Sequence, residues 1–151
     1  MGKELILALK PTLVGFANIL EVDWTLLAGQ IMVESSGNPQ AKGGMGEIGL
    51  AQLFLTTAQD RIPKLTKDQL YKPEVNVIAQ GMYLVWLQYY LRNCCECDDY
   101  NFVLAAYNHG IGNVKRLLQA KGTFNDLPFN VQGYVDKVYK FAEQFQGEGD
   151  T

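Results

Sequence analysis

Apolar residues recur along this chain at helical spacing, whereas the strict alternation of a β-strand never persists over several residues. Signals that start helices are frequent: Pro11 can open a helix that ends near Leu20, and Asp23 can cap a helix that starts at Trp24. The other predicted helices cover 3–10, a short segment that Thr56 caps and that ends at Arg61, 74–92, a segment after Asp98 or Asp99 that ends at Tyr107, 112–121 and 131–145. The chain is therefore expected to be all-α, with little or no β-sheet.

The helix predicted at 74–92 is the candidate for the centre of the fold, and Pro73 can open it. Its apolar residues fill much of the helix circumference, which is typical of a helix buried on several sides. These residues are Val77, Ile78, Met82, Leu84, Val85, Leu87 and Leu91.

A glycine-rich segment interrupts the helical pattern between residues 37 and 49. It contains five glycines, at positions 37, 43, 44, 46 and 49. Glycine permits positive φ angles and a close approach of the backbone to other groups. The segment is either a plain flexible loop or part of a site, because loops held by rigid helices often carry function.

Glu34 stands where an apolar helical stretch meets this glycine-rich segment. Leu27 and Ile31 lie one helical turn apart, and Glu34 continues their row at the next turn. A carboxyl at the edge of a buried face is disfavoured as an anion, so its pKa is expected to rise. A raised pKa allows a glutamate to hold a proton near neutral pH and deliver it to a leaving group. The alternative is a glutamate at a helix end whose carboxylate lies in water.

The composition is that of one globular domain. The chain has 151 residues, of which 48% are hydrophobic and 19% are charged, so it can bury a sizeable core. The net charge of -3 gives no global basic field that would favour nucleic acid or an anionic membrane. No apolar run reaches membrane-spanning length, and the apolar part of 3–10 is too short for a signal peptide, so we expect no export signal in this chain.

Three cysteines lie together at positions 94, 95 and 97, and His109 is the only histidine. An odd, closely spaced set of cysteines does not form a disulfide framework. A zinc site needs four ligands, so we expect neither a metal nor another cofactor. Reduced thiols are the expectation, with a link from Cys94 or Cys95 to Cys97 as the alternative in an oxidising compartment.

Three segments of the chain form an ordered set of motifs. They are Glu34-Ser35-Ser36-Gly37-Asn38-Pro39, then GEIGLAQL from Gly46 to Leu53, then Ala106-Tyr107-Asn108-His109-Gly110. The set resembles the soluble lytic transglycosylase domain, a relative of goose-type lysozyme, which shows Glu-Ser with Asn-Pro, then Gly-x-x-Gly-Leu-Met-Gln, then Ala-Tyr-Asn-x-Gly. The resemblance extends to Pro73-Glu74-x-Asn76 and to Tyr134-Val135, and it covers about residues 20–142.

The resemblance implies a lysozyme-like α fold in one domain spanning 1–151. It also implies an enzyme that cleaves the β-1,4 bond between N-acetylmuramic acid and N-acetylglucosamine in peptidoglycan. In that family the muramic 6-hydroxyl, rather than water, attacks its own anomeric carbon, and the product is a 1,6-anhydro sugar. One carboxyl can serve first as the acid and then as the base, so a single glutamate is enough.

By resemblance, Glu34 is that catalytic acid and base. The residues expected to bind substrate are Ser35, Gln52, Tyr107, Asn108 and Tyr134. Simpler roles stay open for three of them: Tyr107 can pack at a helix end, Tyr134 can belong to the core, and Ser35 can satisfy backbone groups where its helix ends.

The chain departs from the family pattern beside the expected cleft. Ala51 stands where the family usually has methionine, and Phe54-Leu55 replaces Met-Pro. Gly43 stands where the family often has a serine that contacts the acetamido group. These differences bear on fine specificity rather than on the class of reaction.

Glu47 is a carboxylate in a loop where the family has small residues. It is either a solvated loop charge or a second carboxylate that positions water. The second role would make the enzyme an inverting hydrolase, provided that the two carboxyls lie roughly 6.5–9.5 Å apart. Asp60 is a weaker candidate for the same role.

Three functions follow from these residues. The first is a peptidoglycan lytic transglycosylase that acts on the bacterial cell wall, delivered by a phage or a secretion apparatus or present as the mature form of a secreted protein. The second is a muramidase or chitinase-like hydrolase that uses Glu34 with Glu47 or Asp60. The third is an inactive glycan-binding module of a larger assembly, against which the intact Glu34 and Gln52 argue. We expect peptidoglycan strands as the partner, no nucleic acid, no membrane span and a monomer.

Overall fold

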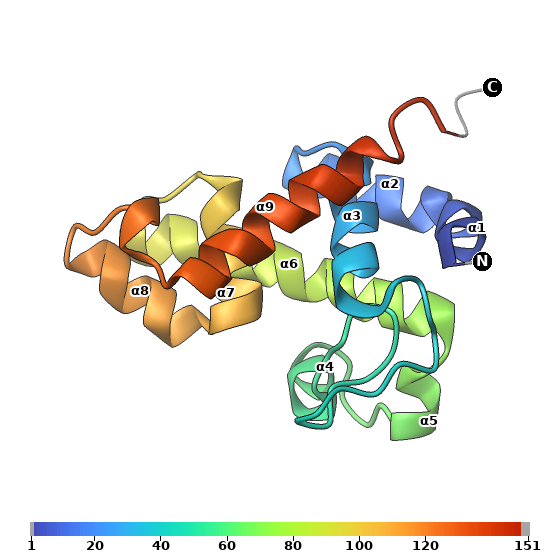
Figure 1. Cartoon of the computed structure of the whole chain (residues 1–151). Coiled ribbons are helices and arrows are strands. Elements are labelled where there is room, and N and C mark those ends of the chain that lie inside the picture. The colour runs from blue at the N-terminus through green and yellow to red at the C-terminus, as the bar shows by residue number, and fades with distance from the viewer. Residues whose placement is uncertain (1, 149–151) are drawn as a thin grey trace.

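A computed structural model describes residues 2–148, and these residues fold mainly into helices, with a long irregular segment at 36–54 (Figure 1). The α-helices are α1 (Gly2–Ala8), α2 (Lys10–Leu20), α3 (Trp24–Ser35), α4 (Leu55–Arg61), α5 (Lys67–Leu70), α6 (Pro73–Cys95), α7 (Tyr100–His109), α8 (Ile111–Gln119) and α9 (Phe129–Glu143). A 3₁₀ helix, η1, covers Phe124–Asp126. Within 2–148, β-type pairing is limited to isolated bridges from Ile48 to Lys42 and to Leu53. The all-α prediction is confirmed.

The long helix α6 runs through the middle of the molecule, as predicted (Figure 1). Helices α2, α4, α7 and α8 all pack against it. Val77, Leu84, Leu87 and Leu91 are fully buried. Burial does not extend to every apolar residue of this helix, since Ile78 is 38% exposed.

Three apolar residues of α6 remain partly exposed to solvent. Ile78 faces a surface hollow shared with residues 62–65, while Met82 and Val85 face another hollow shared with Phe16 of α2. No helix covers these flanks within the described part of the chain, so apolar side chains there remain partly in water. None of the helices in residues 2–148 combines the length and apolar character that crossing a membrane requires.

Helices α3 and α9 form the most extensive helix pair in residues 2–148, and Figure 1 shows α9 crossing directly over α3. The crossing is close because α3 presents Gly29 to the α9 backbone. A Cβ atom at this position would lie 2.7 Å from the backbone nitrogen of Ala142. The N-terminus of α3 is fixed as predicted, since the Asp23 carboxylate accepts from the Thr25 amide at 3.0 Å.

The glycine-rich segment folds back onto α6 through one buried side chain, Asn76. The Asn76 Oδ1 atom accepts from the Ala51 amide at 2.8 Å. Its Nδ2 atom donates to the carbonyls of Ile48 at 2.9 Å and Leu70 at 3.0 Å. These bonds hold the loop above a small second core, which consists of Ile48, Ala51, Leu53, Ala58, Leu65, Leu70 and Ala79.

Several helix boundaries differ from the prediction. Helix α4 begins two residues earlier than a helix capped by Thr56 would, so Thr56 lies inside it, and Phe54 occupies the N-cap without a side-chain hydrogen bond. The helices α5 and η1 were not predicted, because each is a single short turn with no apolar periodicity. Helix α9 starts at Phe129 and ends at Glu143, two residues earlier at each end than predicted.

The cysteine expectation is also corrected. The structure joins the neighbouring Cys94 and Cys95 in a disulfide and leaves Cys97 as a free thiol. The backbone turns into the left-handed conformation at Glu96, where α6 ends, and Cys97 therefore lies beyond the helix that carries the other two cysteines. Within residues 2–148 there is no cluster of three His, Cys, Asp or Glu side chains that could hold a metal ion.

Candidate active site

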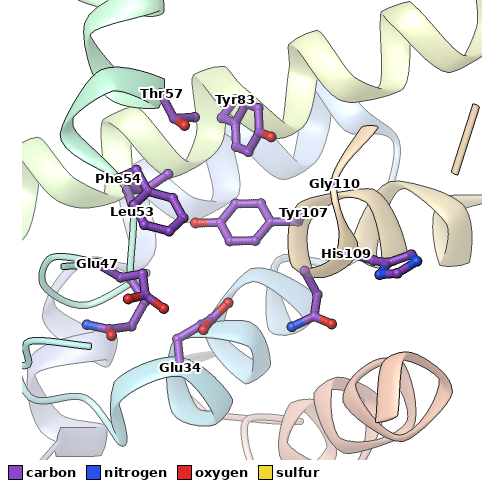
Figure 2. A pocket seen from close by; sticks show the side chains of 11 residues that line it. Glu34, Glu47, Leu53, Phe54, Thr57, Tyr83, Tyr107, His109 and Gly110 are labelled. Carbon is purple, nitrogen blue, oxygen red and sulfur yellow. The ribbon is translucent and has the colours of Figure 1, made fainter. Parts of the chain in front are cut away.

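A cavity of about 390 Å³ opens between the end of α3, the glycine-rich segment, α4, α6 and α7 (Figure 2). Four elements therefore surround the C-terminal end of α3. The lining residues are Glu34, Glu47, Gln52, Leu53, Phe54, Thr57, Tyr83, Tyr107, Asn108, His109 and Gly110.

Glu34 lies in the last turn of α3, and its half-buried carboxyl faces this cavity (Figure 2). The helix ends just beyond it because Ser36 adopts the left-handed conformation with φ 55°. Burial raises the pKa of Glu34 from 4.5 to about 7; a hydrogen bond from Tyr134 opposes the rise and the negative charge of Glu47 adds to it. The expected direction of the pKa shift is therefore present, and desolvation is its main cause.

Tyr134 is the residue that contacts the Glu34 carboxyl. Its hydroxyl donates to Glu34 Oε2 at 2.8 Å and accepts from Gln30 Nε2 at 3.0 Å. The side chain is only 7% exposed and lies beneath the cavity rather than in its lining. The alternative considered for Tyr134, a place in the core, matches this burial, and its contact in the site is with the candidate acid rather than with the cavity.

Tyr107 crosses the middle of the cavity, between Tyr83 and Glu34 (Figure 2). Its hydroxyl donates to the Ala51 carbonyl at 2.7 Å, which ties α7 to the glycine-rich segment. Burial raises the pKa of Tyr107 well above its usual range, so the phenol stays protonated. The ring of Tyr83 packs on it with centroids 5.3 Å apart.

Gln52 lines the cavity from a strained backbone position with φ 50°. Its amide nitrogen donates to the carbonyls of Ala41 at 3.1 Å and Gly49 at 3.0 Å. These two bonds fix the amide, and Oε1 is the Gln52 atom that can accept a hydrogen bond from a ligand.

Glu47 lies beside Gln52 in the same wall. Its Oε1 atom accepts from the Met45 amide at 2.8 Å. A Cβ atom on Gly43 would lie 2.5 Å from Glu47 Oε1 and 2.7 Å from Gln52 Oε1. The glycine at 43 therefore makes room for two acceptor oxygens, a pair suited to the N–H or O–H groups of an amino sugar.

The other predicted site residues divide into two groups. Asn108 lines the cavity, whereas Ser35 and Asp60 do not. The Ser35 hydroxyl donates to the Ile31 carbonyl at 3.2 Å and accepts from the Gly37 amide at 3.2 Å, so it satisfies the end of α3. The open alternative for Ser35 matches these contacts.

Six lining residues were not among the site residues expected from the sequence: Leu53, Phe54, Thr57, Tyr83, His109 and Gly110. Leu53 ends the second motif, and Phe54 and Thr57 follow it closely. Tyr83 of α6 lies outside all three motifs, and only the three-dimensional arrangement brings it to the cavity. His109 and Gly110 follow Asn108 directly, so their place in the motif Tyr107 to Gly110 could have indicated them.

Known proteins resemble this chain in sequence and in fold. Residues 16–130 match the family described as the transglycosylase SLT domain. A membrane-bound lytic murein transglycosylase F of Maricaulis maris is 32% identical over 119 residues, which are 74% of this chain and 25% of that protein. The transglycosylase of Enterobacteria phage PRD1 is 34% identical over 89 residues, 59% of this chain and 30% of that protein.

Two solved structures share the fold. The lytic transglycosylase Slt of Pseudomonas aeruginosa superposes with a TM-score of 0.68 and 25% identity, covering 90% of this chain and 24% of that one. The 70 kDa soluble lytic transglycosylase of Escherichia coli gives a TM-score of 0.67 at 24% identity, covering 87% of this chain and 24% of that one. These similarities confirm the expected lysozyme-like fold, and this chain spans about a quarter of the length of each solved relative.

Proposed function

This chain belongs to the transglycosylase SLT domain family, and from that premise we propose that it is a peptidoglycan lytic transglycosylase with Glu34 as its single acid and base. The observation that carries the proposal is the Glu34 carboxyl itself. It faces the cavity, is half-buried, has a pKa raised to about 7 and receives a hydrogen bond from Tyr134. Such a carboxyl can hold a proton at neutral pH and can also exist as an anion.

The reaction needs both states of that carboxyl. Protonated Glu34 donates its proton to the glycosidic oxygen as the bond from that oxygen to the muramic C1 breaks. The resulting carboxylate then takes the proton of the muramic 6-hydroxyl while the 6-oxygen forms its bond to C1. The product is a 1,6-anhydro sugar, no water is consumed, and Glu34 returns to its protonated state.

The other cavity residues bind and shape the substrate. Gln52 Oε1 and the Glu47 carboxylate converge above Gly43 and accept hydrogen bonds from the amino sugar. Tyr107 acts through its ring, since its hydroxyl is committed to Ala51. Asn108, which also lines the cavity, supplies further hydrogen-bonding groups.

A hydrolase is the second candidate, and one observation favours it: Glu47 lines the same cavity as Glu34. The contact between Glu47 Oε1 and the Met45 amide gives this carboxylate a loop-stabilising role as well. Asp60 lies outside the cavity lining, which weakens it as the second carboxylate.

Mass spectrometry of muropeptides released from purified peptidoglycan tests the proposal. We expect products that end in 1,6-anhydromuramic acid, one water lighter than the reducing sugar, and a loss of release of at least about a hundredfold in Glu34→Gln. The Glu47→Gln variant should keep the anhydro product. Reducing-end products lost in Glu47→Gln would establish the hydrolase, and no Glu34-dependent release would leave a glycan-binding module.

The place where the protein acts follows from the proposed substrate. The substrate lies in the bacterial cell wall, so the protein acts in the periplasm or at the cell exterior. A phage transglycosylase is among the relatives, which supports delivery during phage entry or lysis. Delivery by a bacterial secretion apparatus is the alternative. Peptidoglycan strands are the expected partner, bound by a monomer without a cofactor.

A further inference from the structure

Two buried glutamines lie directly beneath the candidate acid, on two different helices. Gln30 of α3 and Gln80 of α6 are both fully excluded from solvent. Gln80 Nε2 donates to Gln30 Oε1 at 2.9 Å, and Gln30 Nε2 donates to the Tyr134 hydroxyl at 3.0 Å. The Tyr134 hydroxyl then donates to Glu34 Oε2 at 2.8 Å. Four side chains thus form one continuous hydrogen-bond chain that ends on Glu34.

The direction of this chain is fixed at its far end by a backbone carbonyl. Gln80 Nε2 also lies 3.4 Å from the Leu27 carbonyl oxygen, which can only accept a hydrogen bond. The Gln80 atom nearest to Leu27 must therefore be the amide nitrogen. The same nitrogen faces Gln30, so the Gln30 oxygen must accept there and its own nitrogen must face Tyr134.

This orientation leaves the Tyr134 hydroxyl only one arrangement. Its oxygen already accepts from Gln30, so its proton points to Glu34 Oε2. We propose that Gln30 and Gln80 are positioning residues that hold the Tyr134 hydroxyl as a hydrogen-bond donor to Glu34 Oε2. The importance of this arrangement for catalysis rests on the proposed function, whereas the arrangement itself does not.

The consequence for Glu34 concerns which of its oxygens can carry the proton. With Oε2 occupied as an acceptor from Tyr134, the proton of neutral Glu34 belongs on Oε1. Oε1 is the carboxyl oxygen left for the substrate in the cavity. After the proton has been delivered, the same donor stabilises the carboxylate, and hydrogen bonds aligned in one direction strengthen one another.

The unpaired oxygen of Gln80 distinguishes this role from plain core packing. Gln80 Oε1 is buried and has no hydrogen-bond partner among the described residues. A buried acceptor without a partner lowers stability, and an apolar residue of similar length would avoid that loss. The amide nitrogen of Gln80 therefore supplies something that packing alone does not require.

Other groups that influence Glu34 come from three further elements. Glu47 of the glycine-rich segment raises its pKa by charge repulsion, and Tyr107 of α7 interacts with it electrostatically. Tyr83 of α6 and His109 of α7 line the same cavity. The test must therefore change the glutamines and leave all four of these residues in place.

The experiment is a pH titration of the Glu34 side-chain carboxyl by ¹³C NMR, with Gln30→Met and Gln80→Met as the variants. Without the glutamine chain, Tyr134 is free to accept from a proton on Oε2, which favours the neutral acid. We expect the pKa of Glu34 to rise by about one unit in Gln30→Met and by about half a unit in Gln80→Met. At pH 5, where Glu34 is protonated in all variants, kcat should fall about tenfold in Gln30→Met because the proton is misplaced.

Gln88→Met is the matched control. Gln88 is a buried glutamine of the same helix α6, and its Nε2 donates to the Leu20 carbonyl at 2.8 Å, with no connection to Tyr134. This variant should leave the pKa of Glu34 unchanged. In a Tyr134→Phe background, adding Gln30→Met should also produce no further shift, because the glutamines act through the Tyr134 hydroxyl.

Two results would overturn the proposal. One is an unchanged Glu34 titration in both Gln30→Met and Gln80→Met; the other is a Gln30→Met shift that persists without the Tyr134 hydroxyl. The titration does not depend on activity. If the shifts occur but wild-type protein releases no anhydro-muropeptides, the proposed function fails while the hydrogen-bond chain stands.

Discussion

At the scale of single residues, Glu34 combines two opposing influences in one carboxyl. Burial disfavours its charge, while the hydroxyl of Tyr134 stabilises that charge from below. The balance leaves a pKa of about 7, so the folded protein keeps a proton that an unfolded glutamate would lose near 4.5. A group tuned in this way affects stability as well as chemistry.

The first prediction follows from that linkage. Between pH 4.5 and about 7 the folded state binds more protons at Glu34 than the unfolded state, so the free energy of unfolding falls as pH rises. Glu34→Gln removes this loss. Its stability relative to wild type should therefore rise across this window by up to about 3 kcal/mol and level off above it. Urea unfolding at several pH values measures the difference, and a difference that does not change with pH would contradict the pKa assigned to Glu34.

The second prediction concerns Gly43, whose missing side chain lets two acceptor oxygens converge. A Cβ atom at 43 would displace the side-chain ends of Glu47 and Gln52 and no backbone atoms, so Gly43→Ala should change Tm by no more than a few degrees. KM for peptidoglycan should nevertheless rise about tenfold, equivalent to about 1.4 kcal/mol of binding.

Gly44→Ala is the control for this prediction. A Cβ atom at Gly44 meets nothing within 4 Å, so this neighbouring substitution changes the loop backbone to a similar extent without displacing either oxygen. An equal rise of KM in both variants would assign the effect to loop flexibility instead of the paired oxygens.

The residue scale also shows what sequence can and cannot predict about a site. Glu34 and Gln52 could be placed in the cavity because each belongs to a motif with a fixed spacing. Gln30 and Gln80 could not be related to Glu34, because a glutamine in an apolar helix has the same sequence pattern whether it faces solvent or the core. Their function depends on the crossing of three helices, which local sequence does not encode.

At the scale of secondary structure, the glycine-rich segment depends on α6 for its shape. Asn76 replaces the strand pairing that such a loop would otherwise need, since it satisfies one amide and two carbonyls of the backbone. Gly49 must be glycine for the same reason: its φ is +76° and a Cβ atom would lie 2.5 Å from Asn76 Nδ2. Asn76 thus hydrogen-bonds the site wall to the central helix.

The third prediction tests that attachment. Asn76→Ala leaves the Ala51 amide and the carbonyls of Ile48 and Leu70 without their partner, and should lower stability by about 3 kcal/mol. Amide hydrogen exchange should show Ala51 losing protection. Gln88→Ala, which removes one hydrogen bond elsewhere on α6, should cost about 1 kcal/mol and leave the exchange of Ala51 unchanged.

Helix boundaries show where local signals were sufficient. The start of α3 was predicted from Asp23, and the structure confirms it because the capping bond is local. The start of α4 was predicted two residues late, because Thr56 is a good cap by type while the chain path from the glycine-rich segment makes Phe54 the actual N-cap. Tertiary structure thus overrode a local preference in α4 and agreed with it in α3.

At the scale of the whole molecule, the crossing of α3 and α9 brings the candidate acid and its donor together. Glu34 lies at the end of α3 and Tyr134 near the start of α9, so the distance between these helices sets the length of their 2.8 Å hydrogen bond. The helices approach so closely because Gly29 lies against the backbone of Val138 and Ala142. Packing far from the cavity therefore controls the geometry inside it.

The last prediction is that Gly29→Ala damages both the fold and the site. The added Cβ atom would lie 2.7 Å from the Ala142 nitrogen, and because backbone atoms cannot turn aside, α9 must move away from α3. We expect a loss of stability of about 2–3 kcal/mol and a rise in the pKa of Glu34, since a lengthened bond to Tyr134 stabilises the carboxylate less. Thermal unfolding and NMR titration of the carboxyl measure the two effects. Gly15→Ala is the control, because a Cβ atom at this exposed position of α2 meets nothing within 4 Å, and it should raise stability by about 0.5–1 kcal/mol through helix propensity alone. A Gly29→Ala protein as stable as wild type would mean that the close crossing does not set the distance between Glu34 and Tyr134.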